Sequence, residues 1–260
     1  MNINGILDVV RRHAPEEYAA DWDNCGISVL GSVEEVGRVA VALDPTPDFV
    51  REALAWGAGL IVTHHPLYFD PVAPNRDGRY LDVLRMVLGA GCWLYGAHTS
   101  LDCRPDGPAS WLGRALGLQD ARVLEPVEAG SAVGYGQMGR LPAPLDWAAF
   151  TDLLGSCIDR EVWAEVGVRP ATVSTVAYLP GSGSSAMTAA ALAGADVFIT
   201  GDLKYHQALE APLCTLDVGH FSLEEEMTRL FAAELESALE GVEVTFFPSV
   251  DPFRFSAIVR

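Results

Sequence analysis

The sequence predicts an α/β protein built from two related lobes, and three observations support this. Short apolar runs alternate with stretches of helical periodicity along most of the 260-residue chain, which is typical of β-α-β units. One such unit resembles another that comes later in the chain. The apolar runs also end in clusters of histidine and carboxylate residues, at the position where α/β sheets bind ligands.

The first half of the chain contains the expected elements of one lobe. Residues 1–13 carry apolar side chains at helical spacing and predict an amphipathic helix. Thr46 and Pro47 suit the N-cap and first position of a helix that ends before Gly57. The remaining expected strands and helices are strands at 27–30, 38–43, 60–62 and 93–95, and helices at 80–90 and 109–116.

The second half changes pattern. Residues 131–141 are rich in glycine and alternate in character, which predicts an exposed or edge strand. Further strands are expected at 172–179, 197–200, 213–218, 241–247 and 253–259, and helices at 146–158, after Ser185 and at 219–239. We expect one lobe to comprise residues 1–125 and 215–260, and the other to comprise residues 126–214.

Two β-α-β segments align with each other. The aligned parts are 39–41 with 176–178, Gly57 with Gly194, and 60–63 with 197–200. The alternative is chance similarity, because apolar strands resemble one another. An internal duplication predicts that strand ends from both lobes meet in one cleft, with the metal site inside it.

Composition constrains partners and location. Half of the residues are apolar and the net charge is −18, with Lys204 the only lysine. Such an acidic chain is expected to bind neither nucleic acid nor a membrane surface, whereas a small anionic substrate remains compatible with it because bound metal ions reverse charge locally. Five scattered cysteines, with no signal peptide and no long apolar run, predict a soluble cytoplasmic protein.

Four polar clusters follow predicted strands: His64 with His65, His98 with Asp102, Asp202 with His206, and His220 with Glu224. Pro66 turns the chain directly after the paired histidines, so both rings can face one site. Imidazole nitrogens and carboxylate oxygens without thiolates suit Zn, Mn, Fe or Co. The alternative for each cluster is a set of ordinary polar residues at a strand end.

The stretch Gly181-Ser182-Gly183-Ser184 lies between a strand and a helix, where backbone amides can bind a phosphate. It lacks the Lys-Ser/Thr ending of a P-loop and the spacing of a dinucleotide-binding fingerprint. A tight turn with Ser184 or Ser185 as the helix cap explains the stretch equally well.

Five motifs together resemble the NIF-three-like family, whose members are also described as dinuclear metal-centre hexameric proteins or GTP cyclohydrolase I type 2 homologues. The motifs occur in the family's order and span nearly the whole chain. They are Trp22-Asp23-Asn24-Cys25-Gly26, Thr63-His64-His65-Pro66, His98-Thr99-Ser100-Leu101-Asp102, Ile199-Thr200-Gly201-Asp202-Leu203-Lys204-Tyr205-His206 and Gly219-His220-Phe221-Ser222-Leu223-Glu224.

The resemblance implies a NIF-three-like duplicated α/β fold, two divalent transition-metal ions per chain and a homohexamer. It assigns His64 and His220 to one ion, His65 and Asp102 to the other, and Glu224 to both as a bridge. The family motif usually has Asn where this chain has Ser100. This difference concerns the surroundings of the site, because Asp102 itself is retained.

Two predictions of function result. The first is a metal-dependent hydrolase, cyclohydrolase-like, acting on a nucleotide or phosphoester, with His98 and His206 transferring protons and Lys204 meeting an anionic group. Lys204 is equally compatible with a solvated helix position. The second is a metal-binding oligomeric scaffold or regulatory protein without turnover. An open coordination position and a cleft that admits a substrate would distinguish the first from the second.

Overall fold

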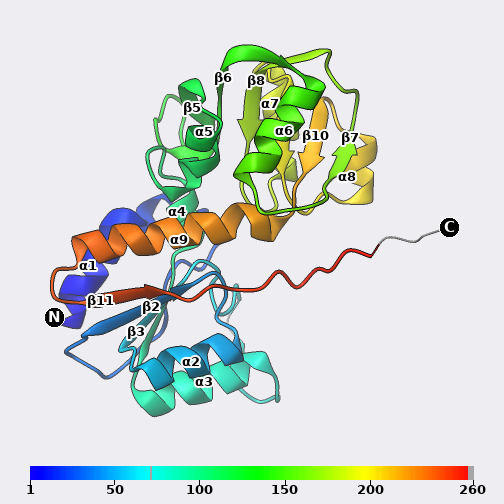
Figure 1. The fold of residues 1–260 in the computed structure, drawn as a ribbon. Helices are drawn as coiled ribbons and strands as arrows, with labels where there is room; N and C mark the ends of the chain where they lie inside the picture. Colours follow the sequence, from blue (N-terminus) through cyan, green and yellow to red (C-terminus); the bar gives the residue numbers. More distant parts are fainter. Residues whose placement is uncertain (71, 257–260) are drawn as a thin grey trace. The chain divides into compact units, whose positions relative to one another are not determined.

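The computed structural model describes residues 1–70 and 72–256, which fold into two compact units (Figure 1). The first unit contains Met1–Pro108 and Met227–Ser249, and the second contains Ala109–Glu226 and the chain from Val250 onward. Each unit has its own β-sheet with helices around it, so the prediction of a mixed α/β protein is confirmed. No helix within the described ranges is long and apolar enough to cross a membrane.

The first unit is built on a five-stranded sheet with the order β1-β4-β3-β2-β11. Strands β2, β3, β4 and β11 run parallel, and β1 pairs antiparallel with β4. The strand bounds are β1 Gly26–Val29, β2 Arg38–Ala42, β3 Leu60–Thr63, β4 Trp93–Gly96 and β11 Glu243–Phe246. Because β3 and β4 are parallel neighbours, their carboxyl ends lie at the same edge of the sheet.

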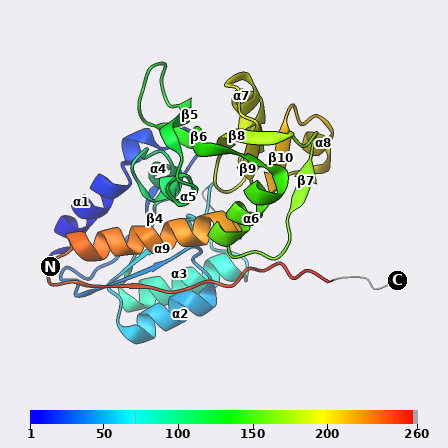
Figure 2. The same ribbon diagram turned by 45° about the horizontal axis from the view of Figure 1, so that its top comes forward.

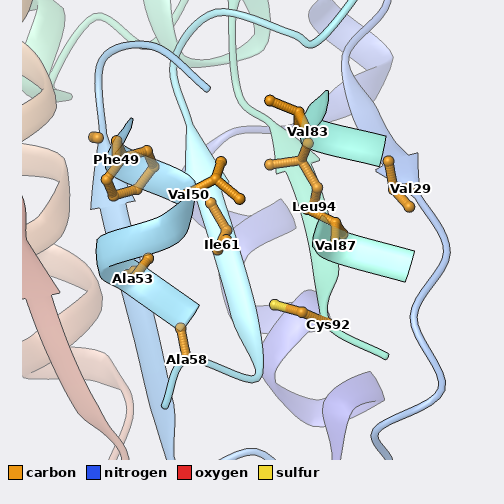
Figure 3. Close-up of a cluster of buried hydrophobic side chains, with 12 residues drawn as sticks. Val29, Phe49, Val50, Ala53, Ala58, Ile61, Val83, Val87, Cys92 and Leu94 are labelled. Carbon is orange, nitrogen blue, oxygen red and sulfur yellow. The ribbon is translucent and has the colours of Figure 1, made fainter. Parts of the chain in front are cut away.

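Helices cover both faces of this sheet. Helices α2 and α3 lie on one face, and α1 and the later part of α9 lie on the other (Figure 1). The helix bounds are α1 Ile3–His13, α2 Pro47–Trp56, α3 Arg79–Ala90, α4 Thr99–Asp102 and α9 His220–Ala238. On the first face, apolar side chains of α2 and α3 pack on the strands, as Figure 3 shows for Phe49, Val50, Val83, Val87, Ile61 and Leu94.

Helix α2 illustrates how local sequence sets these elements. The Thr46 hydroxyl accepts a hydrogen bond from the Phe49 amide over 3.2 Å, as an N-cap does, and Pro47 occupies the first helical position. Gly57 ends the helix with φ = 94°, a left-handed conformation that side chains with a Cβ adopt only with strain. The predicted start and end of this helix are both present.

The second unit contains a six-stranded sheet with the order β5-β6-β8-β9-β10-β7. The bounds are β5 Gln119–Pro126, β6 Gly134–Asp146, β7 Ala164–Val166, β8 Thr172–Tyr178, β9 Val197–Thr200 and β10 Cys214–Asp217, with helices α5 Trp111–Ala115, α6 Trp147–Cys157, α7 Met187–Leu192 and α8 Tyr205–Leu209. Helix α6 lies on one face of the sheet and α7 on the other (Figure 1 and Figure 2). On the α7 side, Met187 and Ala190 pack with Met138 and Phe198.

Two expectations for strands need correction. The glycine-rich strand near 131–141, which is β6, is not at an edge, because it pairs with β5 on one side and β8 on the other. Strand β5, which the sequence did not predict, takes the edge position instead. Residues 253–256 form no strand, and the rest of the closing strand expected at 253–259 lies outside the described residues.

The two aligned β-α-β segments pair their strands in the same register. Val39 lies opposite Leu60 in the first unit, and Val176 lies opposite Val197 in the second. These are the residues that the sequence alignment matches. Gly57 and Gly194, which follow the two helices, also share the left-handed conformation. A duplicated segment predicts this agreement.

Candidate metal centre

Strand β3 presents His64 and His65 at its carboxyl end. The amide of His64 donates to the Ala42 carbonyl oxygen over 3.1 Å, so the sheet ladder with β2 continues to the first histidine. The chain then turns at Pro66, and the two imidazole ring centroids lie only 5.0 Å apart. Adjacent side chains in a regular strand would point to opposite faces, so it is the turn that brings these two rings together.

His98 and Asp102 come from the end of β4. His98 directly precedes α4, and Asp102 is the last residue of that helix. One ring nitrogen from each of His64, His65 and His98 lies within 4.8 Å of the other two. Asp102 Oδ1 lies 3.8 Å from His64 Nε2. Three imidazoles and a carboxylate therefore converge at one edge of the first sheet.

Each of the three imidazoles in this group is held at Nδ1 by an oxygen atom that accepts a hydrogen bond. The three bonds run from His64 to the Ala97 carbonyl oxygen (3.3 Å), from His65 to Asp44 Oδ1 (3.1 Å) and from His98 to Asp23 Oδ1 (2.9 Å). Carbonyl and ionised carboxylate oxygens only accept, so Nδ1 carries the proton and Nε2 carries the lone pair. Metal-binding histidines are oriented in this way, so the residues fit a metal site.

Asp23 is the most extensively bonded carboxylate of the group, and its side chain is fully buried. Its oxygens accept hydrogen bonds from His98, from the amide and hydroxyl of Thr99 and from the thiol of Cys25. Burial alone would raise the pKa of Asp23, but these hydrogen bonds outweigh burial and hold it well below its ordinary value. Asp23 is therefore a permanent acceptor for His98.

The ring of His98 is also fixed from the solvent side. The indole of Trp22 and the ring of Phe69 meet it edge-on, with centroid distances of 5.9 Å and 5.7 Å. These two aromatic side chains are themselves 65% and 53% exposed. Edge contacts of this kind restrict rotation of the imidazole without covering the site with a further polar group.

In the second unit, His220 and Glu224 lie in the first turns of α9. His220 Nε2 lies 2.6 Å from Glu224 Oε2, and His220 Nδ1 lies 2.8 Å from Asp202 Oδ2. Like the three imidazoles of the first unit, this ring therefore has an oxygen acceptor at Nδ1, and unlike them it also has a carboxylate oxygen close to Nε2. Of the two carboxylates that contact His220, Glu224 is the more buried: its side chain is 4% exposed, and that of Asp202 is 46% exposed.

Glycines make room for His220 and Glu224. A Cβ built on Gly181, whose φ is 67°, would lie well inside 3.0 Å of Glu224 Oε1. A Cβ on Gly201 would collide in the same way with the His220 amide nitrogen. The glycine-rich stretch therefore provides a cradle for the Glu224 carboxylate. The Gly183 amide is already bonded to Thr200 Oγ1 over 2.9 Å, so that amide is engaged within the protein rather than directed to a phosphate.

His206 and Lys204 lie at the start of α8 and are exposed. The amide of Lys204 donates to Gln207 Oε1 over 2.9 Å, and the His206 ring lies 5.3 Å from that of Tyr205. Their predicted roles in proton transfer and substrate binding stay predictions.

The donor set is nitrogen and oxygen only. Cys25 lies beside Asp23, but burial and the Asp23 carboxylate raise its thiol pKa to about 11, so it is not a thiolate near neutral pH. Imidazole and carboxylate groups together suit divalent transition metals. Sequence analysis missed Asp23 and Asp44 as residues that orient this site, although Asp23 belongs to one of the five motifs.

Comparisons with known proteins show which family the chain resembles. The family described as Duf34/NIF3 (NGG1p interacting factor 3) matches residues 1–252. A GTP cyclohydrolase 1 type 2 homolog of Streptomyces coelicolor is 35% identical over 237 residues, which are 85% of this chain and 81% of the relative. One from a Nostoc species is 32% identical over 220 residues, covering 82% and 83%. A Bacillus cereus protein related to NIF3 has the same fold, with a TM-score of 0.88 at 23% identity over 98% and 99% of the two chains.

Proposed function

We propose that this chain, which belongs to the Duf34/NIF3 family, binds two divalent transition-metal ions and uses them to hydrolyse a small substrate. The observation that supports the proposal is the set of imidazoles whose Nδ1 atoms are all held by oxygen acceptors. The proposed ligands are His64 and His220 for one ion, His65 and Asp102 for the other, and Glu224 for both.

The bound ions would polarise a substrate oxygen and lower the pKa of a water molecule. The chain's own contribution is orientation and proton transfer. We assign His98 to proton transfer at Nε2, because Asp23 accepts a hydrogen bond from its Nδ1 over 2.9 Å and leaves Nε2 available. His206 is the second proposed proton carrier, and Lys204 the proposed contact for an anionic group.

The proposed substrate is a nucleotide or another phosphorylated small molecule. The curated relatives carry the name GTP cyclohydrolase 1 type 2 homolog, which suggests hydrolysis of a ring or ester in such a compound. We further propose a cytoplasmic homohexamer, as the resemblance implies, with no nucleic-acid or membrane partner for a chain of net charge −18.

Metal content tests the first part of this proposal. Protein purified without chelator, supplemented with Zn, Mn, Fe or Co and desalted, should hold about two equivalents by elemental analysis. His65→Ala should mainly weaken one ion, whereas Glu224→Ala should lose both, because removing a bridging carboxylate leaves two dications with stronger mutual repulsion. A stoichiometry that stays at one or below after supplementation contradicts the dinuclear assignment, and equal loss of one ion from both variants contradicts the bridge.

A metal-binding protein without turnover is the second candidate. The family description, NGG1p interacting factor 3, names an interaction with another protein, and this favours a scaffold or regulatory role. A screen of the fully metallated protein against nucleotides, phosphoesters and cyclic amides separates the two functions. Metal-dependent turnover that falls in Asp102→Ala supports the hydrolase, and its absence across the screen supports the scaffold.

A further inference from the structure

A cavity of about 350 Å³ is formed in the first unit by the segment that leads into α3 and by the first residues of that helix. Its wall is formed by residues between Val72 and Tyr80 and includes Asn75, Arg76 and Arg79. The volume lies at the low end of the range of roughly 300–1,000 Å³ that is typical of small-molecule sites. The cavity therefore suits a compact group rather than a large apolar ligand.

The lining is positive in a chain that is otherwise strongly acidic. The cavity is lined by two arginines, Arg76 and Arg79, and by one acidic residue, Asp77, whose Oδ1 lies 3.7 Å from an Arg85 nitrogen. No ion pair involves Arg76 within the described residues. The lining residues therefore carry one more positive than negative charge, in a protein whose net charge is −18.

The wall also offers neutral donors. Asn75 contributes an amide, and Tyr80 a phenol whose ring is positioned by an edge contact with Tyr68 at a centroid distance of 5.8 Å. Guanidinium groups present several N–H donors in a planar fork that matches the oxygens of phosphate. The chemistry of the wall is therefore that of an oxyanion site.

One carboxylate joins this cavity to the imidazole group. Asp44 Oδ1 lies 3.1 Å from His65 Nδ1 and 3.5 Å from an Arg79 nitrogen. The Arg79 contact is longer than the 2.7–2.9 Å of a tight charge-assisted bond, so the guanidinium keeps donors for a further anion. A ligand bound at Arg79 would lie one residue away from the ring that we assign to a metal ion.

We propose that the cavity at Arg76 and Arg79 binds the phosphoryl group of the substrate and so places the rest of that molecule at the imidazole group. The inference rests on the proposed function for the identity of the reacting site, and it assigns the anion to Arg76 and Arg79 rather than to Lys204 alone. It specifies the substrate class as phosphorylated compounds. Acetate, a planar oxyanion of lower charge, should bind more weakly than phosphate.

The test uses metal-free full-length protein, so that metal–phosphate contacts play no part. Inorganic phosphate, pyrophosphate and acetate are titrated by calorimetry at low ionic strength. We expect saturable phosphate binding that weakens about tenfold or more in Arg76→Ala and in Arg79→Ala, since each removes a charge-assisted contact. Arg51→Ala is the matched control, because Arg51 is an exposed arginine of α2 in the same unit that does not line the cavity.

The outcomes are distinct. Binding that is lost in both cavity variants and retained within about twofold in Arg51→Ala supports the proposal. No saturable phosphate binding, or equal weakening in all three variants, overturns it and indicates general charge screening only. Acetate binding as strong as that of phosphate overturns the assignment to a phosphoryl group. Metal content is measured on the same variants and should be unchanged for Arg76→Ala. Loss of phosphate binding at the cavity can then be distinguished from loss of the metal site.

Discussion

Replacing Gly181 with alanine should lower the metal content of the protein, because the new Cβ displaces the Glu224 carboxylate. Gly181 has φ = 67°, and a Cβ at this position would lie well inside 3.0 Å of Glu224 Oε1. Glu224 is 4% exposed and is also tied to His220, with 2.6 Å between Glu224 Oε2 and His220 Nε2. The carboxylate therefore has little space into which it can move without leaving its place beside His220.

The expected loss of folding stability in Gly181→Ala has two parts. Alanine in a left-handed conformation costs about 1–2 kcal/mol relative to glycine. Displacing a buried side chain adds about 1–3 kcal/mol of overpacking. Gly194→Ala is the matched control, because Gly194 has φ = 85° but a Cβ there meets no heavy atom within 4 Å. Gly194→Ala should thus show the backbone cost alone, and Gly181→Ala should show both.

Thermal unfolding and metal analysis measure the two parts separately. At about 2–4 °C per kcal/mol for a chain of this size, Gly194→Ala should lower Tm by roughly 2–8 °C and keep its full metal content. Gly181→Ala should lower Tm further and, after desalting from excess metal, hold at least one equivalent less than the parent protein. It should also lose the rise in Tm that metal produces in the parent. Full metal content in Gly181→Ala, with a Tm equal to that of Gly194→Ala, would refute the cradle.

Two further predictions concern buried groups of the first unit. Asp23→Asn should lower the free energy of unfolding by about 2–3 kcal/mol in chemical unfolding, because the amide group puts a competing donor in place of an oxygen that accepts from His98 and Thr99. The same variant should lower turnover more than metal content. Asp48→Asn, at an exposed pair with Arg51, is the control and should change the free energy of unfolding by less than about 0.5 kcal/mol. Burial raises the pKa of the Cys92 and Cys103 thiols to about 12, so iodoacetamide at pH 8 should label neither in folded protein and both in urea. The raised pKa of Cys92 also makes the free energy of unfolding depend on pH. Its contribution is fully present below about pH 9 and should be lost as the pH rises from about 9 towards 12. Rapid labelling of either cysteine in folded protein at pH 8 would contradict the burial argument.

Much of the first unit was predictable because its signals are local. The cap at Thr46, the proline at Pro47 and the glycine at Gly57 set the bounds of α2 without reference to the rest of the chain. The apolar run of β3 is short and fully buried, as a parallel central strand requires. Placing His64 and His65 directly after this run was enough to predict that they share an edge with His98.

The errors come from strand order, which depends on pairing between distant segments. Strand β6 shows the glycine-rich, alternating pattern of an exposed strand, yet β5 covers its outer side. Strand β5 itself has four exposed residues at its start and carries a bulge, so its pattern is weak. Periodicity reports the faces of a strand and contains no information about which strand lies beside it.

Asp23 and Asp44 were missed for a related reason. Asp23 lies 75 residues before His98, and Asp44 lies 21 residues before His65. Their roles arise from the fold, which brings a loop and a strand end behind imidazoles on other strands. A search of the sequence for ligand spacing finds residues that approach a metal, and it has no means of finding the acceptors behind them.

These two carboxylates also bear on whether the site can catalyse. Each places a negative charge behind an imidazole, Asp23 behind the proposed proton carrier His98 and Asp44 behind the proposed ligand His65, and fixes the orientation of that ring. The same charge would offset part of the positive charge of a bound cation and so moderate its effect on the pKa of a water molecule. Asp44 differs from Asp23 in this respect, because Arg79 lies 3.5 Å from its Oδ1 and offsets part of its charge. An anion bound at Arg79 would draw the guanidinium away from Asp44 and strengthen the hold of His65 on its ion, so phosphate binding and metal affinity should increase together.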